Sequence, residues 1–216
     1  MKKYFKYFMY VIEHKYNIYR AYRILKKNKT IRKAMGVKTF IHVIFHDMSK
    51  FLPSEFIPYA RYFYGDYPSS EEIGNKIDLY SGKTKEEVKE EFDEAWKLHY
   101  SRNPHHWEYW HEQQLCMPVE YLIYEVIDWT AMSLKFGGTP QEYYIENMYK
   151  EEIYHDEMSK KWLEEILFAR YLSRGDKNDS NNYPFNYSKI LSYYMIWFDT
   201  RFDNKKILNK LFKEYK

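Results

Sequence analysis

An adjacent histidine and aspartate, His46-Asp47, is the first feature of this sequence that could do chemistry. Such a pair offers a metal ion an imidazole nitrogen together with a carboxylate that can bridge to a second ion. Adjacent pairs also occur by chance, and His155-Asp156 is a second example in this chain. The charged surroundings of Asp156 favour a helix N-cap there. The interpretation of His46-Asp47 therefore depends on other ligands elsewhere in the sequence.

The remaining candidate ligands are four histidines and one aspartate: His14, His99, His105, His106 and Asp128. His14 faces apolar positions of a predicted amphipathic helix, where a core histidine bonded to a tyrosine is the alternative interpretation. His99, His105 and His106 lie among tryptophans and tyrosines, which favours a dry cavity that binds metal or substrate. Asp128 lies on a helix that is apolar nearly all round, so its carboxylate is expected to be buried. A cation would remove the free-energy cost of burying that charge.

Four further polar residues have open roles. His42 precedes His46 by one turn, so it could be another ligand, a hydrogen-bond partner of a ligand, or a solvated side chain. His111 is the weakest candidate of the histidine-rich segment. Glu55 and Glu125 are carboxylates close in sequence to candidate ligands, and Glu125 is interpreted as a partner of a ligand or of a lysine.

The order of these residues, H, HD, H, HH and D, resembles that of the HD-domain superfamily of metal-dependent phosphohydrolases. The segment from His46 to Lys50 looks like the H-D-x-G-K variant of the HD-GYP branch, with Ser49 in the place of the glycine. The resemblance covers roughly residues 10–135. No GYP signature follows the histidine pair, so the resemblance does not imply specificity for cyclic di-GMP.

The resemblance implies a binuclear metal centre that activates water against a phosphoester, in particular a nucleotide. It assigns His14, His46, Asp47 and Asp128 to one ion and His99, His105 and His106 to the other, with Asp47 as the bridge. Asp47 and Lys50 would be the catalytic residues, and Lys50 would reach a substrate phosphate. The ligand types suit two divalent ions of Mn, Fe, Co, Ni or Zn.

Two other functions use the same ligands. HD-type di-iron oxygenases look like these hydrolases but bind O₂ and cleave C–C or C–P bonds. A third possibility is a protein that binds a nucleotide or a partner in its aromatic cavity and uses the metal for structure.

The composition predicts an all-α protein, and the resemblance implies that about seven to nine helices form one HD-domain-like bundle. Glycine and proline number only seven each in 216 residues, which favours long helices over turn-rich sheet. We expect one domain over residues 1–216, with the metal site in residues 10–135 and accessory helices in residues 139–216. The predicted helices cover residues 2–28, 31–47, 53–64, 84–99, 119–136, 140–150, 156–174, 187–202 and 205–215, and residues 105–111 are expected to form a short aromatic segment.

Net charge, cysteine content and hydropathy indicate the compartment and the classes of partner. The net charge of +3 is too small to indicate a nucleic acid or a membrane surface. The single cysteine, Cys116, cannot form an internal disulfide, and no apolar stretch approaches the roughly 20 residues that span a bilayer. We therefore expect a cytoplasmic protein without membrane association. The polar segment 65–82 is expected to be a flap over the site or a surface loop.

Overall fold

The computed structural model describes residues 2–65, 82–149 and 156–167, and in these residues it contains helices and no strand. The predicted all-α fold is confirmed. The helices are α1 (Lys2–Leu25), α2 (Lys29–Ala34), α3 (Val37–Phe45), α4 (Pro53–Tyr64), α5 (Lys85–Arg102), α6 (Trp107–Glu112), α7 (Val119–Phe136), α8 (Pro140–Tyr144) and α9 (Glu157–Leu167). A 3₁₀ turn, η1 (Met48–Phe51), links α3 to α4, and a π-helical turn, η2 (Ile145–Tyr149), follows α8.

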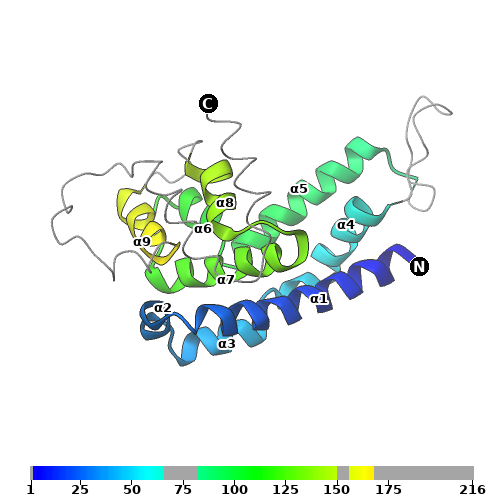
Figure 1. Ribbon diagram of the computed structural model, residues 1–216. Coiled ribbons are helices and arrows are strands. Elements are labelled where there is room, and N and C mark those ends of the chain that lie inside the picture. Colours follow the sequence, from blue (N-terminus) through cyan, green and yellow to red (C-terminus); the bar gives the residue numbers. More distant parts are fainter. Residues whose placement is uncertain (1, 66–81, 150–155, 168–216) are drawn as a thin grey trace, which may run out of the picture. The chain divides into compact units, whose positions relative to one another are not determined.

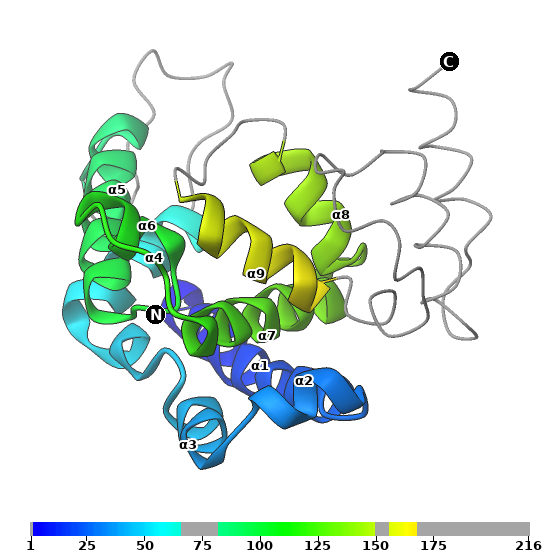
Figure 2. The same ribbon diagram turned by 90° about the vertical axis from the view of Figure 1, so that its left-hand side faces the viewer.

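The helix α7 is central in the arrangement. It packs against α1 on one side and against α9 on the other, and both Figure 1 and Figure 2 show it between these two helices. The helix α1 also contacts α3 and α4, and α4 packs along α5. The helices α1, α3 and α7 contact one another, and α4 connects α5 to α1. The candidate ligands on or next to α1, α3, α5 and α7 are therefore brought to one region.

Local sequence signals account for several helix ends. Thr84 begins α5 with a capping box, in which its hydroxyl accepts a hydrogen bond from Glu87 N and the Glu87 carboxylate accepts one from Thr84 N. Pro53 stands in the first turn of α4, where its missing N–H is not needed. Gly137 ends α7 with a φ of 87°, a conformation that glycine adopts without steric cost.

The predicted helix 31–47 is wrong as a single element, because the chain breaks into α2 and α3 at Gly36. Gly36 is extended, with φ −115° and ψ −170°, and precedes the first turn of α3. The Thr39 hydroxyl accepts a hydrogen bond from Gly36 N at 3.2 Å, which stabilises the new helix start. The periodic apolar pattern continues across the break, so the pattern alone predicted one continuous helix through Gly36.

The C-terminal helices are described only in part. The predicted helix 140–150 becomes α8 followed by η2, and α9 begins at the predicted place because Asp156 accepts hydrogen bonds from Met158 N and Ser159 N. Residues 66–81 of the segment 65–82, predicted to be a flap or a surface loop, lie outside the described residues, as do the predicted helices 187–202 and 205–215 and His155. The division into a site core and accessory helices stays a prediction.

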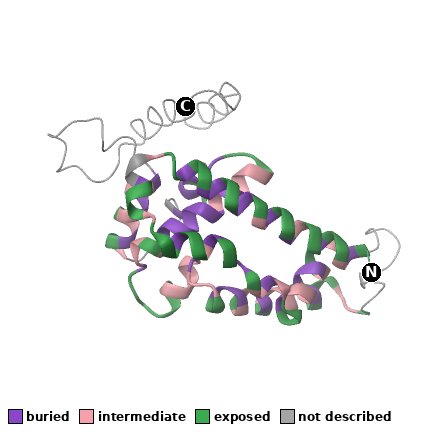
Figure 3. Cartoon of the chain, turned by 90° about the horizontal axis from the view of Figure 1, so that it is seen from below, coloured by how far each residue is buried: buried purple, intermediate pink, exposed green. Residues whose placement is uncertain are grey.

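A small aromatic core adjoins the region that the four helices enclose. It contains Tyr7, Val11, Tyr59, Ala60 and Ala95, all buried. Figure 3 shows buried positions on the inner sides of the helices and exposed positions on their outer sides. Among the described residues, no helix is long and apolar enough to cross a membrane.

Candidate metal centre

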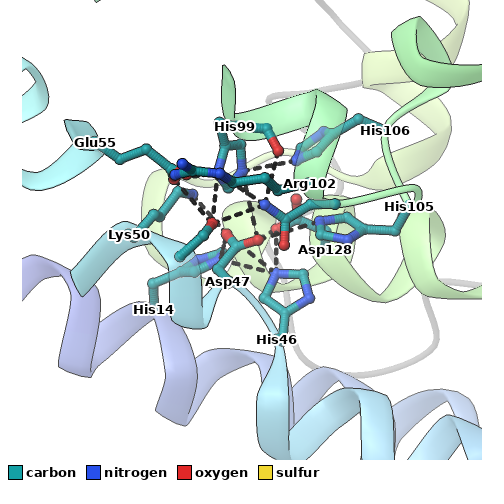
Figure 4. A network of polar contacts seen from close by, with 12 residues as sticks. His14, His46, Asp47, Lys50, Glu55, His99, Arg102, His105, His106 and Asp128 are labelled. Atoms are coloured by element: carbon teal, nitrogen blue, oxygen red, sulfur yellow. Dashed lines mark hydrogen bonds and ion pairs between the residues drawn. The ribbon is translucent and has the colours of Figure 1, made fainter. Parts of the chain in front are cut away.

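The structure brings the seven predicted ligands together from five different segments of the chain. His14 comes from the middle of α1, His46 and Asp47 from the turn after α3, and His99 from the last turn of α5. His105 and His106 come from the loop before α6, and Asp128 from the middle of α7. All except His106 are buried, and His106 is partly buried. Figure 4 shows their side chains pointing toward one another.

Asp47 lies at the centre of this cluster. Its Oδ2 atom is 3.5 Å from His14 Nε2 and 3.4 Å from His46 Nε2. Its Oδ1 atom is 3.5 Å from His99 Nε2 and 3.3 Å from His105 Nε2. The two carboxylate oxygens therefore face two separate groups of histidines.

The backbone of Asp47 explains how it reaches this position. Its φ of 54° and ψ of 29° lie in the left-handed region, which is uncommon for a residue with a side chain. The turn lies between the end of α3 and η1, so His46 and Asp47 both point inward instead of following a helical period. Such conformations carry a free-energy cost of about 1–3 kcal/mol and cluster at functional sites.

Among the described residues, three groups could hold a metal ion: one is His42, His46 and His105, and the other two consist only of the seven predicted ligands. These two groups divide the cluster. One consists of His14, His46 and Asp128, in which Asp128 Oδ1 is 3.3 Å from His14 Nε2 and 3.7 Å from His46 Nε2. The other consists of Asp47, His99, His105 and His106. Within each group, atoms that could bind a metal lie within 4.8 Å of one another. The cluster could therefore hold metal ions.

The nitrogen positions suit either a shared proton or a shared metal ion. His14 Nε2 and His46 Nε2 are 3.3 Å apart, and His99 Nε2 and His106 Nε2 are 3.0 Å apart. Two unprotonated imidazole nitrogens at this distance repel each other unless a proton or a cation lies between them. Asp47 Oδ1, Asp128 Oδ1 and both ring nitrogens of His105 are also buried without a hydrogen bond. Buried atoms in this state are costly, and metal ligation removes the cost.

In two of the histidines, the Nδ1 atom, which faces away from the cluster, is within hydrogen-bond distance of another side chain. His99 Nδ1 is 2.8 Å from Glu55 Oε2, and His46 Nδ1 is 3.1 Å from His42 Nε2. A hydrogen on Nδ1 leaves the lone pair on Nε2, which faces the cluster in both residues. His42 therefore contacts a candidate ligand, which agrees with one of the roles predicted for it. Its ring stacks on that of Tyr124, with the ring centroids 3.9 Å apart.

Glu55 belongs to a network that its sequence position alone does not indicate. The carboxylate is fully buried, and it accepts hydrogen bonds from Ser49 Oγ at 2.9 Å and from Arg102 at 2.9 Å. Asn103 donates to Ser49 Oγ at 2.8 Å and to the His99 carbonyl at 2.7 Å. The two remaining open residues are not in the cluster: Glu125 is buried in α7, and His111 lines a cavity of about 840 Å³ with Trp107 and Trp110.

Lys50 is the internal cation of the site. Its side chain is buried, and its Nζ lies 2.6 Å from Asp47 Oδ2. Burial by itself would lower the pKa of this ammonium, but Asp47 and Asp128 outweigh it and raise that pKa. Burial likewise acts to raise the pKa of Asp47, but His46 and Lys50 hold that pKa well below its usual range. Lys50 is therefore charged and directed at the carboxylate of Asp47.

The fold and this cluster define an all-helical protein with a buried histidine and aspartate centre that could bind metal. The chain belongs to the family of unknown function DUF5662, whose model matches residues 3–169 and so spans every candidate ligand. No curated protein and no solved structure matches the chain.

The contact between Glu55 and His99 makes a testable prediction. We expect Glu55→Gln to weaken metal binding about 10- to 100-fold, because the carboxylate no longer strengthens and orients the imidazole. Competitive titration with a chelating dye measures the change. Glu91→Gln is the matched control, because the Glu91 carboxylate also accepts a hydrogen bond from an arginine, Arg61, but lies away from the cluster. Equal metal affinity in both variants would contradict the assigned role of Glu55.

A second prediction concerns pH. In the protein without metal, burial acts to lower the pKa of His46, but Asp47 and Asp128 outweigh it and raise that pKa to about 9. The stabilisation from this charged imidazole is complete below the unfolded value of about 6.5 and is lost as the pH rises through about 9. The melting temperature of the metal-free protein should therefore fall across this window in calorimetry. His46→Gln should remove the fall, and an equal fall in that variant would contradict the assignment.

Proposed function

We propose that this protein is a metal-dependent phosphohydrolase with a binuclear centre of the HD-domain kind. The observation that carries the proposal is the position of Asp47, whose two carboxylate oxygens face two different groups of histidines. A shared carboxylate between two ligand groups is what a two-metal site requires. The order of the ligands in the sequence, which resembles that of the superfamily, supports the same proposal.

Each group has enough ligands for one ion. His14, His46, Asp128 and Asp47 Oδ2 would hold the first, and His99, His105, His106 and Asp47 Oδ1 the second. Imidazole and carboxylate together suit divalent ions of Mn, Fe, Co, Ni or Zn. Bound there, two such ions would bind a phosphoester and supply a water molecule acidic enough to attack it near neutral pH.

The protein's own residues would position the reactants. Glu55 and His42 fix the Nε2 lone pairs of His99 and His46 toward the cluster, so the ligands need no rearrangement when an ion binds. Lys50 places a positive charge beside Asp47, where it would meet a non-bridging oxygen of the phosphoester. Trp96 contacts His99 and His106 with ring centroids 5.6 and 5.0 Å apart and shields that side of the cluster from water. These roles make Asp47 and Lys50 the proposed catalytic residues.

The test is an assay of the purified protein, reconstituted with Mn²⁺, on bis(p-nitrophenyl) phosphate and on a panel of nucleotides. We expect hydrolysis that a chelator stops and that added Mn²⁺ restores. An iron signal in electron paramagnetic resonance, together with O₂ consumption and no hydrolysis, would overturn the proposal in favour of an oxygenase. Bound metal without either activity would overturn it in favour of a nucleotide- or partner-binding protein.

A further inference from the structure

Positive charge is concentrated in the first part of the chain. Residues 1–50 contain 13 lysines and arginines against two acidic residues, whereas residues 51–216 contain 21 basic and 29 acidic residues. The two acidic residues of the first part are both in ion pairs: Asp47 is buried beside Lys50, and Glu13 pairs with Lys135 at 2.5 Å. The net charge of +3 therefore hides a strongly basic region formed by α1, α2 and α3.

The helices α1 and α3 and the turn η1 expose an unusual amount of apolar surface. In α3 only Thr39 and Val43 are buried, although six of its nine residues are apolar, so its pattern predicted packing that the structure does not show. Val37 is 77% exposed and Ile41 is 50% exposed. The exposed apolar side chains of α1, α3 and η1 are Phe5, Phe8, Met9, Ile12, Tyr16, Tyr19, Ile24, Val37, Phe40, Ile41, Ile44, Phe45 and Met48. We call this set the N-terminal apolar face.

The residues of this face lie on adjoining helices. Phe8 of α1 contacts Phe51 of η1 with ring centroids 6.1 Å apart, and Tyr22 of α1 contacts Phe40 of α3 at 6.0 Å. Lys15 also links α1 to α3, because its Nζ donates a hydrogen bond to the carbonyl of Ile44 at 3.0 Å. Figure 1 and Figure 2 both show α1, α2 and α3 together on one side of the bundle.

The size of the face exceeds what a monomer usually exposes. An aromatic side chain offers about 150–250 Å² of surface. Thirteen large apolar side chains, each about half exposed, therefore offer on the order of 1,000 Å². The largest apolar patch of an ordinary monomer measures about 300–600 Å² and often marks a binding surface.

Exposed basic side chains accompany the face. Nine lysines and arginines of α1 to α3 and their connections are exposed: Lys2, Lys6, Arg20, Arg23, Lys26, Lys27, Arg32, Lys33 and Lys38. Arg20 and Arg23 lie over the rings of Tyr16 and Tyr19, so cationic and aromatic groups alternate at its edge. A partner of this surface must offer apolar contact and negative charge together.

We infer that the N-terminal apolar face docks on an anionic phospholipid bilayer. An amphipathic surface with phenylalanine, isoleucine and valine on one side and lysine and arginine beside them is the kind that lies in the membrane interface. A second copy of the chain fits less well, because it would bring two basic rims together. A nucleic acid supplies the charge but offers no apolar layer for Val37, Ile41 and Ile44. The inference departs from the expectation of no membrane association, which rested on the net charge and on the lack of a membrane-spanning stretch. It concerns peripheral binding and does not depend on the proposed function.

Vesicle co-sedimentation of the full chain tests the charge. We expect binding to phosphatidylcholine vesicles that contain about 30% phosphatidylserine, at least ten-fold weaker binding to pure phosphatidylcholine, and weakening by salt. Lys33→Glu with Lys38→Glu should weaken binding to the anionic vesicles at least ten-fold. The matched control is Lys97→Glu with Lys161→Glu, which changes the net charge equally on α5 and α9 and should bind like the wild type.

The apolar contribution is tested in the same assay. Ile41→Ser should weaken vesicle binding several-fold, whereas Leu115→Ser, a residue with a similar exposure of 53%, should not. No sedimentation with anionic vesicles would overturn the inference. So would a stable dimer in light scattering that Ile41→Ser separates, or binding to nucleic acid that Ile41→Ser leaves unchanged while vesicle binding is absent. Circular dichroism of each variant checks that it is folded.

Discussion

The Asp47→Asn variant is expected to lose both metal ions and more than 10²-fold of any metal-dependent hydrolysis. An amide has one oxygen where the carboxylate has two, and its NH₂ group would face imidazole nitrogens that have to offer lone pairs. Neither ligand group would then be complete, because Asp47 Oδ1 and Oδ2 each serve a different one. Removing the hydrogen-bond partner of a ligand costs about 10- to 100-fold in affinity, and a shared ligand should cost more.

The same substitution should also destabilise the protein without metal. Lys50 would remain buried without its carboxylate partner, and breaking a buried ion pair in this way costs about 3–5 kcal/mol. Adding Lys50→Met to Asp47→Asn should restore much of the stability but none of the metal binding. Elemental analysis and thermal denaturation separate the two effects, with Asp93→Asn on α5 as a surface control. Full metal content in Asp47→Asn would show that Asp47 is not the shared ligand.

The Lys50→Met variant is expected to keep both ions and to lose on the order of 10²-fold in kcat/KM toward a phosphoester. Methionine keeps the length of the side chain and removes the charge that offsets the phosphate, an interaction worth about 2–4 kcal/mol. Without metal the variant should be less stable than the wild type, because Asp47 loses its closest cation. Bound metal should reduce that difference, since it supplies positive charge to the same carboxylate.

Steady-state kinetics with metal analysis of the same sample decides this prediction. Lys97→Met, on the exposed side of α5, is the control and should retain wild-type kinetics. Unchanged hydrolysis in Lys50→Met would show that the ammonium does not meet the substrate. Loss of metal in the variant would instead show that Lys50 supports the ligands.

The elements with local signals could be predicted closely from the sequence. The bounds of α4 and α7 agree with prediction, because a proline near the first turn marks the start of each and a glycine follows the last residue. The capping box at Thr84 is a similar case. Gly36 was missed because an apolar period runs through it, and the exposure of α3 could not be predicted because periodicity does not show whether a partner covers the apolar side.

In the site, too, some features could be predicted from the sequence and others could not. The order of histidines and aspartates along the chain indicated which residues would meet, and the structure places His14, His46, Asp47, His99 and Asp128 in one cluster with His105 and His106. Their role as metal ligands stays a prediction. The contacts of Glu55 with Ser49, His99 and Arg102 depend on how α4 packs against α5, and no spacing within the sequence encodes that packing.

Elemental analysis of freshly purified protein tests the central claim most directly. Inductively coupled plasma mass spectrometry should find about two divalent transition-metal ions per chain, or about two after reconstitution with Mn²⁺ or Fe²⁺ and removal of the excess. His99→Ala should lower this number, because it removes a ligand of one group, and His111→Ala should not, because His111 lies outside both. Wild-type protein that retains no metal after reconstitution would contradict the account.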